Sequence, residues 1–129
     1  MIRLDEDNLT TLHLTRGDRC TFRAYLIDAK TRERYLFPGG NWVSFVIVRK
    51  LGYTLEEPLL RKKIYIPEDT DEVEFTLTEE DTKIGDMIDK KNKYWYNIVV
   101  NDDVTILGSD DTGEKVIIIY PEVGEKDEQ

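Results

Sequence analysis

Short runs of alternating apolar and polar residues recur along most of this sequence. In the range 20–27, Cys20, Phe22, Ala24 and Leu26 share one face, so a strand is predicted there with Phe22 directed inward. The range 72–77 alternates in the same way and places Phe75 inward. Further strands are expected at 9–14, 42–49, 60–66, 94–100, 104–107 and 116–120. Turn signals fall between them about every 8 to 12 residues, which is typical of an all-β domain.

Two of these ranges carry bulky apolar residues on both faces. In 42–49, one face has Val43, Phe45 and Ile47, while the other has Trp42, Ser44, Val46 and Val48. Apolar character on both faces predicts a strand that is covered on both sides. In 94–100, Trp95 lies opposite the face formed by Tyr94, Tyr96, Ile98 and Val100. Because amphipathic aromatic residues are favoured at interfaces, the second face predicts a possible protein interface formed by Trp42, Val46, Val48 and Trp95.

The range 78–84 is the one place where the sequence predicts a helix. Thr78 is followed three residues later by Asp81, a spacing similar to that of a capping box, and Gly85 is a natural helix stop. One short helix is therefore expected there.

These elements predict an antiparallel, immunoglobulin-like β-sandwich of about seven to nine strands with one short helix. A small closed barrel is the alternative, because the strand count and alternation would be the same. We expect a flexible N-terminal arm at 1–8, a single sandwich domain at 9–121 and an acidic flexible tail at 122–129. After residue 100, Asn101-Asp102-Asp103 is typical of a tight hairpin turn.

Charge and composition narrow the function classes. The net charge of −9 argues against nucleic-acid binding, which depends on clustered Lys and Arg. The charge is uneven, since residues 1–64 hold 12 basic and 8 acidic residues and residues 65–129 hold 6 and 19. This asymmetry could orient neighbouring copies head to tail, or the acidic loops simply favour solubility. No signal peptide or membrane-spanning run is predicted, and one cysteine, Cys20, excludes an internal disulfide.

No catalytic constellation, cofactor site or metal site is predicted. His13 is the only histidine, and Cys20 is expected to be a small core residue. The acidic pairs Asp5/Asp7, Asp69/Asp71, Asp102/Asp103 and Asp110/Asp111 lack a calcium-loop pattern and are interpreted as turn residues. Arg16-Gly17-Asp18 is the tripeptide of integrin ligands, and here it is interpreted as a turn between two strands.

Several of these stretches together resemble a group of small phage structural domains, which includes the amino-terminal domain of siphophage baseplate upper proteins. The matching stretches, in chain order, are the turn at 14–18 leading into 20–27, then WVSFVIVRK at 42–50, VEFTLTEEDTKIGDMI at 73–88, KYWYNIVVND at 93–102 and EKVIIIYPE at 114–122. The resemblance implies a β-sandwich virion component of the tail, baseplate or capsid, made in the host bacterial cytoplasm.

The function expected from the resemblance is non-enzymatic and rests on contacts with other virion proteins, such as capsid, tail or baseplate subunits. A homo-oligomer is compatible with it, whereas nucleic acid and membrane are not expected as partners. The alternative is a carbohydrate-binding module that attaches to the host surface through exposed aromatic residues. A hydrolase that uses loop carboxylates is a third class, because sandwiches can host such sites.

Overall fold

The computed structural model describes residues 2–4, 11–28, 30–49, 58–84, 90–101, 104–107 and 115–121. Within these ranges the chain forms nine strands. They are β1 (Ile2–Leu4), β2 (Thr11–Thr15), β3 (Cys20–Ala24), β4 (Asn41–Val48), β5 (Leu60–Ile66), β6 (Val73–Leu77), β7 (Asn92–Val100), β8 (Val104–Leu107) and β9 (Val116–Tyr120).

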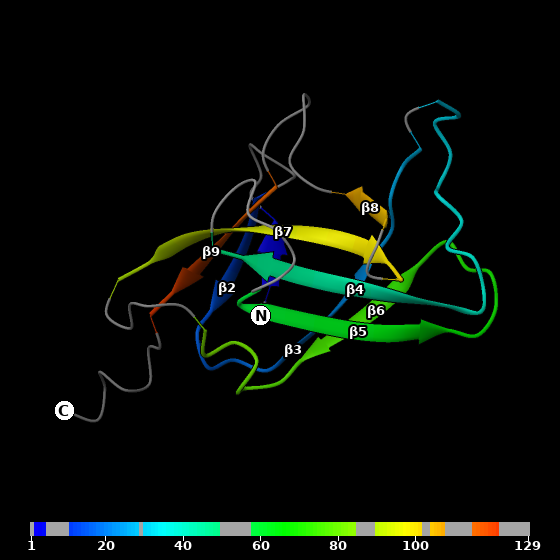
Figure 1. Ribbon diagram of the computed structural model, residues 1–129. Coiled ribbons are helices and arrows are strands. Elements are labelled where there is room, and N and C mark those ends of the chain that lie inside the picture. The colour runs from blue at the N-terminus through cyan, green and yellow to red at the C-terminus, as the bar shows by residue number, and fades with distance from the viewer. Residues whose placement is uncertain are drawn as a thin grey trace.

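Seven of the strands build one large curled sheet, and the other two build a small one (Figure 1). The order in the large sheet is β1-β2-β9-β7-β4-β5, with β8 also pairing with β7. β9 pairs with the beginning of β7 and β8 with its end, and a register irregularity lies between Ile98 and Val99. The small sheet is the antiparallel pair of β3 and β6.

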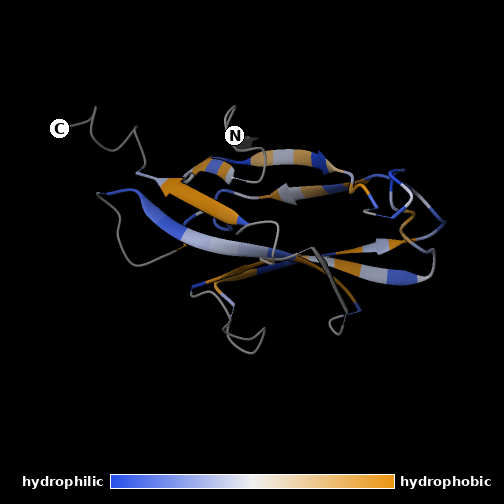
Figure 2. Cartoon of the chain, turned by 90° about the horizontal axis from the view of Figure 1, so that it is seen from above, coloured by the Kyte–Doolittle hydropathy of each residue, from blue (hydrophilic) through white to orange (hydrophobic). Residues whose placement is uncertain are grey.

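The core lies between the two sheets. Buried hydrophobic residues of both sheets form it, and Figure 2 shows hydrophobic positions along the strands of both layers. The fully buried side chains at the centre are Phe45 of β4 and Phe75 of β6, and the partly buried Phe22 of β3 packs against both. Tyr96 of β7 lies next to Phe45, with ring centroids 5.7 Å apart. The alternation in the sequence thus corresponds to two packed sheets with aromatic rings at the centre of the core.

The all-β class is confirmed, but the expected antiparallel arrangement is wrong for one pair of strands. β2 runs parallel to β9, with Leu14 opposite Ile119 and Leu12 opposite Ile117. The large sheet is therefore mixed, and an immunoglobulin-like topology is not confirmed. Strand direction depends on which distant segments pair, and local alternation carries no information about that.

The helix expected at 78–84 is absent, and the segment forms turns instead. The capping box itself is present: the Thr78 amide donates to Asp81 Oδ2 (2.9 Å), and the Asp81 amide donates to Thr78 Oγ1 (3.2 Å). Two further bonds, from the Thr82 amide to the Thr78 carbonyl and from the Lys83 amide to the Glu80 carbonyl, complete the turn. Nucleating a helix is costly, so one capped turn before Gly85 is too short to continue as a helix.

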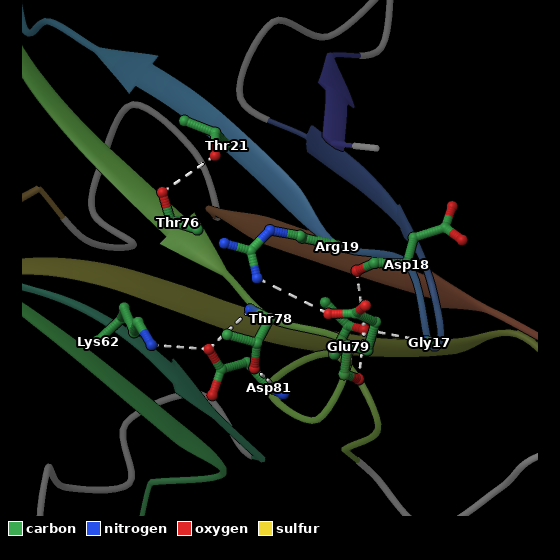
Figure 3. A network of polar contacts seen from close by, with 10 residues as sticks. Gly17, Asp18, Arg19, Thr21, Lys62, Thr76, Thr78, Glu79 and Asp81 are labelled. Carbon is green, nitrogen blue, oxygen red and sulfur yellow. Dashed lines mark hydrogen bonds and ion pairs between the residues drawn. The ribbon is translucent and has the colours of Figure 1, made fainter.

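The 78–84 turn ties the edges of the two sheets together (Figure 3). Lys62, on the core-facing side of edge strand β5, donates to Asp81 Oδ2 at 2.8 Å. Lys62 and Asp81 are both only partly exposed. A charge that points inward on an edge strand also discourages the edge from pairing with another chain.

The same turn holds the connection between β2 and β3. The hydroxyl of buried Thr82 accepts a hydrogen bond from the Gly17 amide (2.9 Å) and lies 3.0 Å from the Asp18 carbonyl. Arg16 donates to the Ile84 carbonyl (2.8 Å). Gly17 has a positive φ of 86°, which favours glycine. The Arg16-Gly17-Asp18 tripeptide is therefore a packed turn, as predicted.

The N-terminal segment is structured where it is described. Residues 2–4 form β1, which pairs antiparallel with β2 and places Ile2 opposite Leu14. They lie within the range 1–8 that was expected to be a flexible arm, and the apolar residues Ile2 and Leu4 are suited to strand pairing. The other residues of 1–8 and the tail 122–129 lie outside the described residues.

Replacing Phe75 tests the aromatic centre. Phe75→Ala removes a fully buried ring that contacts Phe22 and Phe45, so we expect a loss of about 3–5 kcal/mol in the free energy of unfolding. The matched control is Thr76→Ala, which removes only an exposed hydroxyl contact with Thr21 and is expected to cost about 0.5 kcal/mol. Urea denaturation measures both, and equal losses would contradict the assignment of the core.

Replacing Asp81 tests the tie between β5 and the 78–84 turn. Partial burial opposes ionisation of Asp81, but hydrogen bonds from Lys62 and Thr78 outweigh it and lower its pKa. A lowered folded-state pKa stabilises the fold above the unfolded-state value of about 4, and this stability is lost as pH falls through the folded value.

We therefore expect Asp81→Asn to reduce the unfolding free energy by about 1–2 kcal/mol at pH 7 and by less at pH 2–3. Urea denaturation between pH 2 and pH 7 measures this difference, with Glu80→Gln as the exposed control. A deficit that is the same at every pH would show that the carboxylate charge does not matter.

Candidate contact surfaces

An exposed aromatic pair stands on the outer face of the large sheet. Trp42 of β4 and Tyr65 of β5 are direct cross-strand neighbours, with ring centroids 5.3 Å apart in an edge-to-face arrangement. Their exposed fractions are 46% and 50%, large values for such side chains. The ammonium of Lys63 lies 5.7 Å from the Trp42 ring centre. We call Trp42, Lys63 and Tyr65 the platform.

The backbone of Trp42 is clamped from both sides by Asn101. The Trp42 amide donates to Asn101 Oδ1 (2.9 Å), and the Asn101 amide donates to the Trp42 carbonyl (2.8 Å). The Asn101 side-chain amide also donates to Asn41 Oδ1 (2.7 Å). Asn101 has a positive φ of 53°, a conformation that Asn adopts more easily than most residues. The main chain under the exposed ring is therefore held rigidly.

The chain that enters β4 is equally constrained. The Gly40 amide donates to the Ile66 carbonyl (2.6 Å), and the Gly39 amide donates to Asp69 Oδ1 (2.8 Å). A Cβ atom on Gly39 would lie 2.9 Å from the Glu68 Cα, so only glycine fits this close approach. Because Tyr65 immediately precedes Ile66, these contacts fix both aromatic residues of the platform relative to each other. A preorganised aromatic pair loses little conformational entropy on binding.

The four predicted interface residues differ in their exposure to solvent. Trp42 is exposed and Trp95 partly buried, whereas Val46 and Val48 are 0% and 3% exposed within the single chain. Trp95 packs against Val46, Val48 and Val99 in a second apolar cluster on the outer face. Val46 and Val48 therefore do not form part of the platform, and of the four residues only Trp42 does. The interface itself stays a prediction.

A second exposed apolar surface continues from the small sheet. It consists of Tyr25, Ile27 and Leu36, which are 51%, 57% and 55% exposed, and we call it the arm surface. The chain beyond β3 turns back on itself, since Ile27 is bridged to Arg34 and the Tyr35 amide donates to the Leu26 carbonyl. The alternation at 20–27 puts Tyr25 and Ile27 on the face opposite Phe22, but the predicted interface does not include them. Their position beside Arg23 on that side was the available signal.

Asp28 shapes the turn at the tip of this segment. Its Oδ1 accepts hydrogen bonds from the amides of Lys30 (2.8 Å) and Thr31 (3.2 Å), and these bonds lower its pKa. Arg32, whose amide donates to the Asp28 carbonyl, has a positive φ of 64°. The turn is thus held by a side chain that mimics a backbone acceptor.

Arg34 joins the arm surface to the small sheet. Its guanidinium lies 3.9 Å from the centre of the Tyr25 ring, a cation–π contact. It also lies 3.9 Å from Asp71 and 3.8 Å from Glu72. Arg23 of β3 lies close to Glu72 and to Glu74 of β6. These partly exposed ion pairs orient Tyr25 more than they stabilise the fold.

Where the structure describes them, the side chains of the types most often used in catalysis are held in packing contacts. The His13 and Tyr120 rings stack, and His13 Nδ1 lies 2.7 Å from the Tyr120 hydroxyl. Cys20 is buried in the core, as predicted, and burial raises the pKa of Tyr96 to about 12. Among the described residues, no three His, Cys, Asp or Glu side chains converge on a possible metal position. The acidic pairs at 5/7, 102/103 and 110/111 lie outside those residues.

Within the described ranges no helix has the length and apolar character needed to cross a bilayer.

Replacing Asn101 tests the clamp under Trp42. Asn101→Ala loses two side-chain hydrogen bonds and places alanine at positive φ, so we expect it to lower the unfolding free energy by about 2–3 kcal/mol. Asn101→Gly loses the same bonds without the backbone strain and should cost about 1 kcal/mol less. Urea denaturation compares the two variants, and equal costs would show that φ is not constrained at this residue.

In comparisons with known proteins, no protein-family model, no curated protein and no solved structure matches this chain.

Proposed function

We propose that this protein is a non-enzymatic structural component of a phage virion and that it acts through protein contacts made by the platform. The assignment to a virion rests on the resemblance of its strand stretches to small phage structural domains. The observation that supports a contact role is the platform itself, a half-exposed Trp–Tyr pair on a clamped main chain. Trp and Tyr are the residues that most often dominate the binding energy of protein interfaces.

The arrangement of the platform favours protein binding over catalysis. The side-chain amides of its polar neighbours Asn41 and Asn101 form hydrogen bonds with main-chain groups and with each other. These bonds hold the main chain of the platform in place. Lys63 adds one positive charge beside the aromatic pair. An apolar centre with a polar rim is the usual composition of a recognition surface. The partner in this proposal is another virion subunit of the capsid, tail or baseplate.

A carbohydrate-binding module is the second candidate, and the exposed rings of Trp42 and Tyr65 favour it. Aromatic rings with an accessible face can stack on sugars, as they do on other flat apolar surfaces. The edge-to-face contact with Tyr65 and the nearby Lys63 ammonium occupy part of the surroundings of the Trp42 ring. A protein partner, which engages both rings together with Lys63, makes fuller use of this arrangement.

Two measurements on particles test the proposed function. Mass spectrometry of purified particles, from the phage whose genome encodes the chain, should detect it at a fixed copy number. The isolated chain should also rebind to particles that lack it, and Trp42→Ala should weaken that binding by about 30-fold or more, as expected for a central aromatic contact. Lys83→Ala, a change on the exposed side of the 78–84 turn, is the control and should bind normally.

Absence of the chain from the particles would refute the virion role. Binding to a glycan array that Trp42→Ala abolishes, without binding to particles, would instead establish the carbohydrate module.

A further inference from the structure

The arm surface is one face of a chain reversal that continues the small sheet. Beyond β3 the chain turns back, and Ile27 is bridged to Arg34 in an antiparallel register. The same register places Tyr25 opposite Leu36. Residues directly opposite each other in an antiparallel pair lie on the same face, and so do residues two positions apart along one strand. Tyr25, Ile27 and Leu36 therefore share one outward face with Arg34.

The other face of this segment is anchored in the core. Leu26 and Tyr35, which alternate with the arm-surface residues, pack against the core, and Phe37 is fully buried. The rings of Tyr35 and Phe37 meet edge to face with centroids 5.1 Å apart. Phe37 also exchanges two main-chain hydrogen bonds with Thr70 (2.7 and 3.0 Å). The arm surface is therefore exposed on a segment that the core holds in place.

The arm surface and the platform face away from each other. Trp42 alternates with Val43 of the core, so it points outward from the large sheet. Tyr25 follows Ala24, which contacts the core, so it points outward from the small sheet. Because the core lies between the two sheets, these outward directions are opposite. A partner on the arm surface therefore leaves the platform open.

Acidic side chains flank the arm surface. Since Phe37 is bridged to Thr70, the range 68–74 runs alongside the segment that carries the arm surface. Together the ranges 23–37 and 68–74 hold seven acidic residues and four basic ones. The acidic residues are Asp28, Glu33, Glu68, Asp69, Asp71, Glu72 and Glu74, and the basic ones are Arg23, Lys30, Arg32 and Arg34. Negative charge is thus in excess around an exposed apolar centre.

The described part of the chain leaves this excess in place. Within it, the acidic residues of 68–74 form ion pairs with Arg23 and Arg34 alone. The N–O distances of these pairs are 3.5 to 3.9 Å, longer than the roughly 2.8 Å of a charge-assisted hydrogen bond. The carboxylates therefore keep most of their capacity to accept hydrogen bonds. Of the 18 basic residues in the sequence, the side chains outside the described ones are those of Arg3, Lys50 and Lys126.

We infer that the arm surface binds a basic segment of a second protein, one in which Lys or Arg residues flank apolar side chains. The apolar side chains of such a segment cover Tyr25, Ile27 and Leu36, and its cations meet the flanking carboxylates. Nucleic acid and anionic membranes carry negative charge and are repelled by the same carboxylates. The inference goes beyond the proposed function, since it concerns a second surface and a partner of defined chemistry.

A synthetic peptide tests this chemistry. The probe is a fluorescent peptide of about seven residues in which lysine alternates with leucine, and its anisotropy is measured at about 20 mM and about 150 mM salt. We expect saturable binding at low salt that is several-fold weaker at the higher salt. Analogues with glutamate in place of lysine, or serine in place of leucine, should bind at least about tenfold more weakly. Absence of binding at low salt, or equally tight binding of the glutamate analogue, would overturn the inference.

Two double variants show whether the charge acts locally. Asp71→Asn combined with Glu74→Gln removes two carboxylates beside the arm surface and should weaken peptide binding about fivefold at low salt. Glu79→Gln combined with Glu80→Gln removes two carboxylates from the 78–84 turn and should change binding by less than about twofold. Equal effects of the two doubles would show that only the net charge of the chain attracts the peptide, which would contradict a site at the arm surface.

A substitution at the apolar centre locates the contact. Ile27→Ser removes an exposed apolar side chain and should weaken peptide binding about tenfold. Lys83→Ala, on the 78–84 turn, is the control and should bind as the wild type does. Circular dichroism and urea denaturation confirm that each variant is folded, and Leu36→Ser replaces Ile27→Ser if the latter is not. Unchanged binding by a folded variant would place the contact elsewhere.

Sedimentation of the chain alone tests a different occupant. Self-association that Ile27→Ser abolishes would make a second copy of the chain the occupant and would overturn the inference. These results are separate from the test of the proposed function. Peptide binding by a chain that is absent from virions would leave the arm surface intact, whereas a virion component that does not bind the peptide would leave the virion role intact.

Discussion

The contact of Phe22 and Phe75 with Phe45 is the interaction on which the rest of the structure depends. An isolated two-stranded sheet is at most marginally stable in water, so β3 and β6 persist because their inward rings are buried against the large sheet. The segment that carries Tyr25 and Leu36 begins where β3 ends, and the acidic range 68–74 leads into β6. The placement of the arm surface and of the range 68–74 therefore follows from the burial of three aromatic rings in the core.

The strands were largely predictable because burial on one face leaves a period of two in the sequence. The ranges 60–66, 104–107 and 116–120 were predicted with the bounds that β5, β8 and β9 have, and the predicted 42–49 differs from β4 by one residue at each end. The helix prediction failed because capping chemistry specifies how a turn begins and not how far it continues. β1 was missed because three residues are too few to show a period, and the parallel pairing of β2 with β9 leaves no local signal.

The candidate site was predictable only in part. Alternation placed Trp42, Val46 and Val48 on one face correctly, but it could not show that Val46 and Val48 are buried while Trp42 is exposed. Exposure depends on what lies over each position, which is a property of the folded chain. The clamp formed by Asn101 is a contact between residues 59 positions apart, and residue types alone suggested only a turn there. The arm surface likewise depends on a contact between separate residues, because Tyr25 contacts Arg34 only where the chain reverses its direction.

The parallel pairing of β2 and β9 has a consequence for the order in which the protein forms during synthesis. β9 lies between β2 and β7, so the β1–β2 hairpin has no connection to the rest of the large sheet until residues 116–120 have left the ribosome. Leu12 and Leu14 pair with Ile117 and Ile119, which are made more than a hundred residues later. Early strands that await late ones have high contact order and expose apolar surface in the interval. The nascent chain is thus most prone to aggregation just before its final described strand emerges.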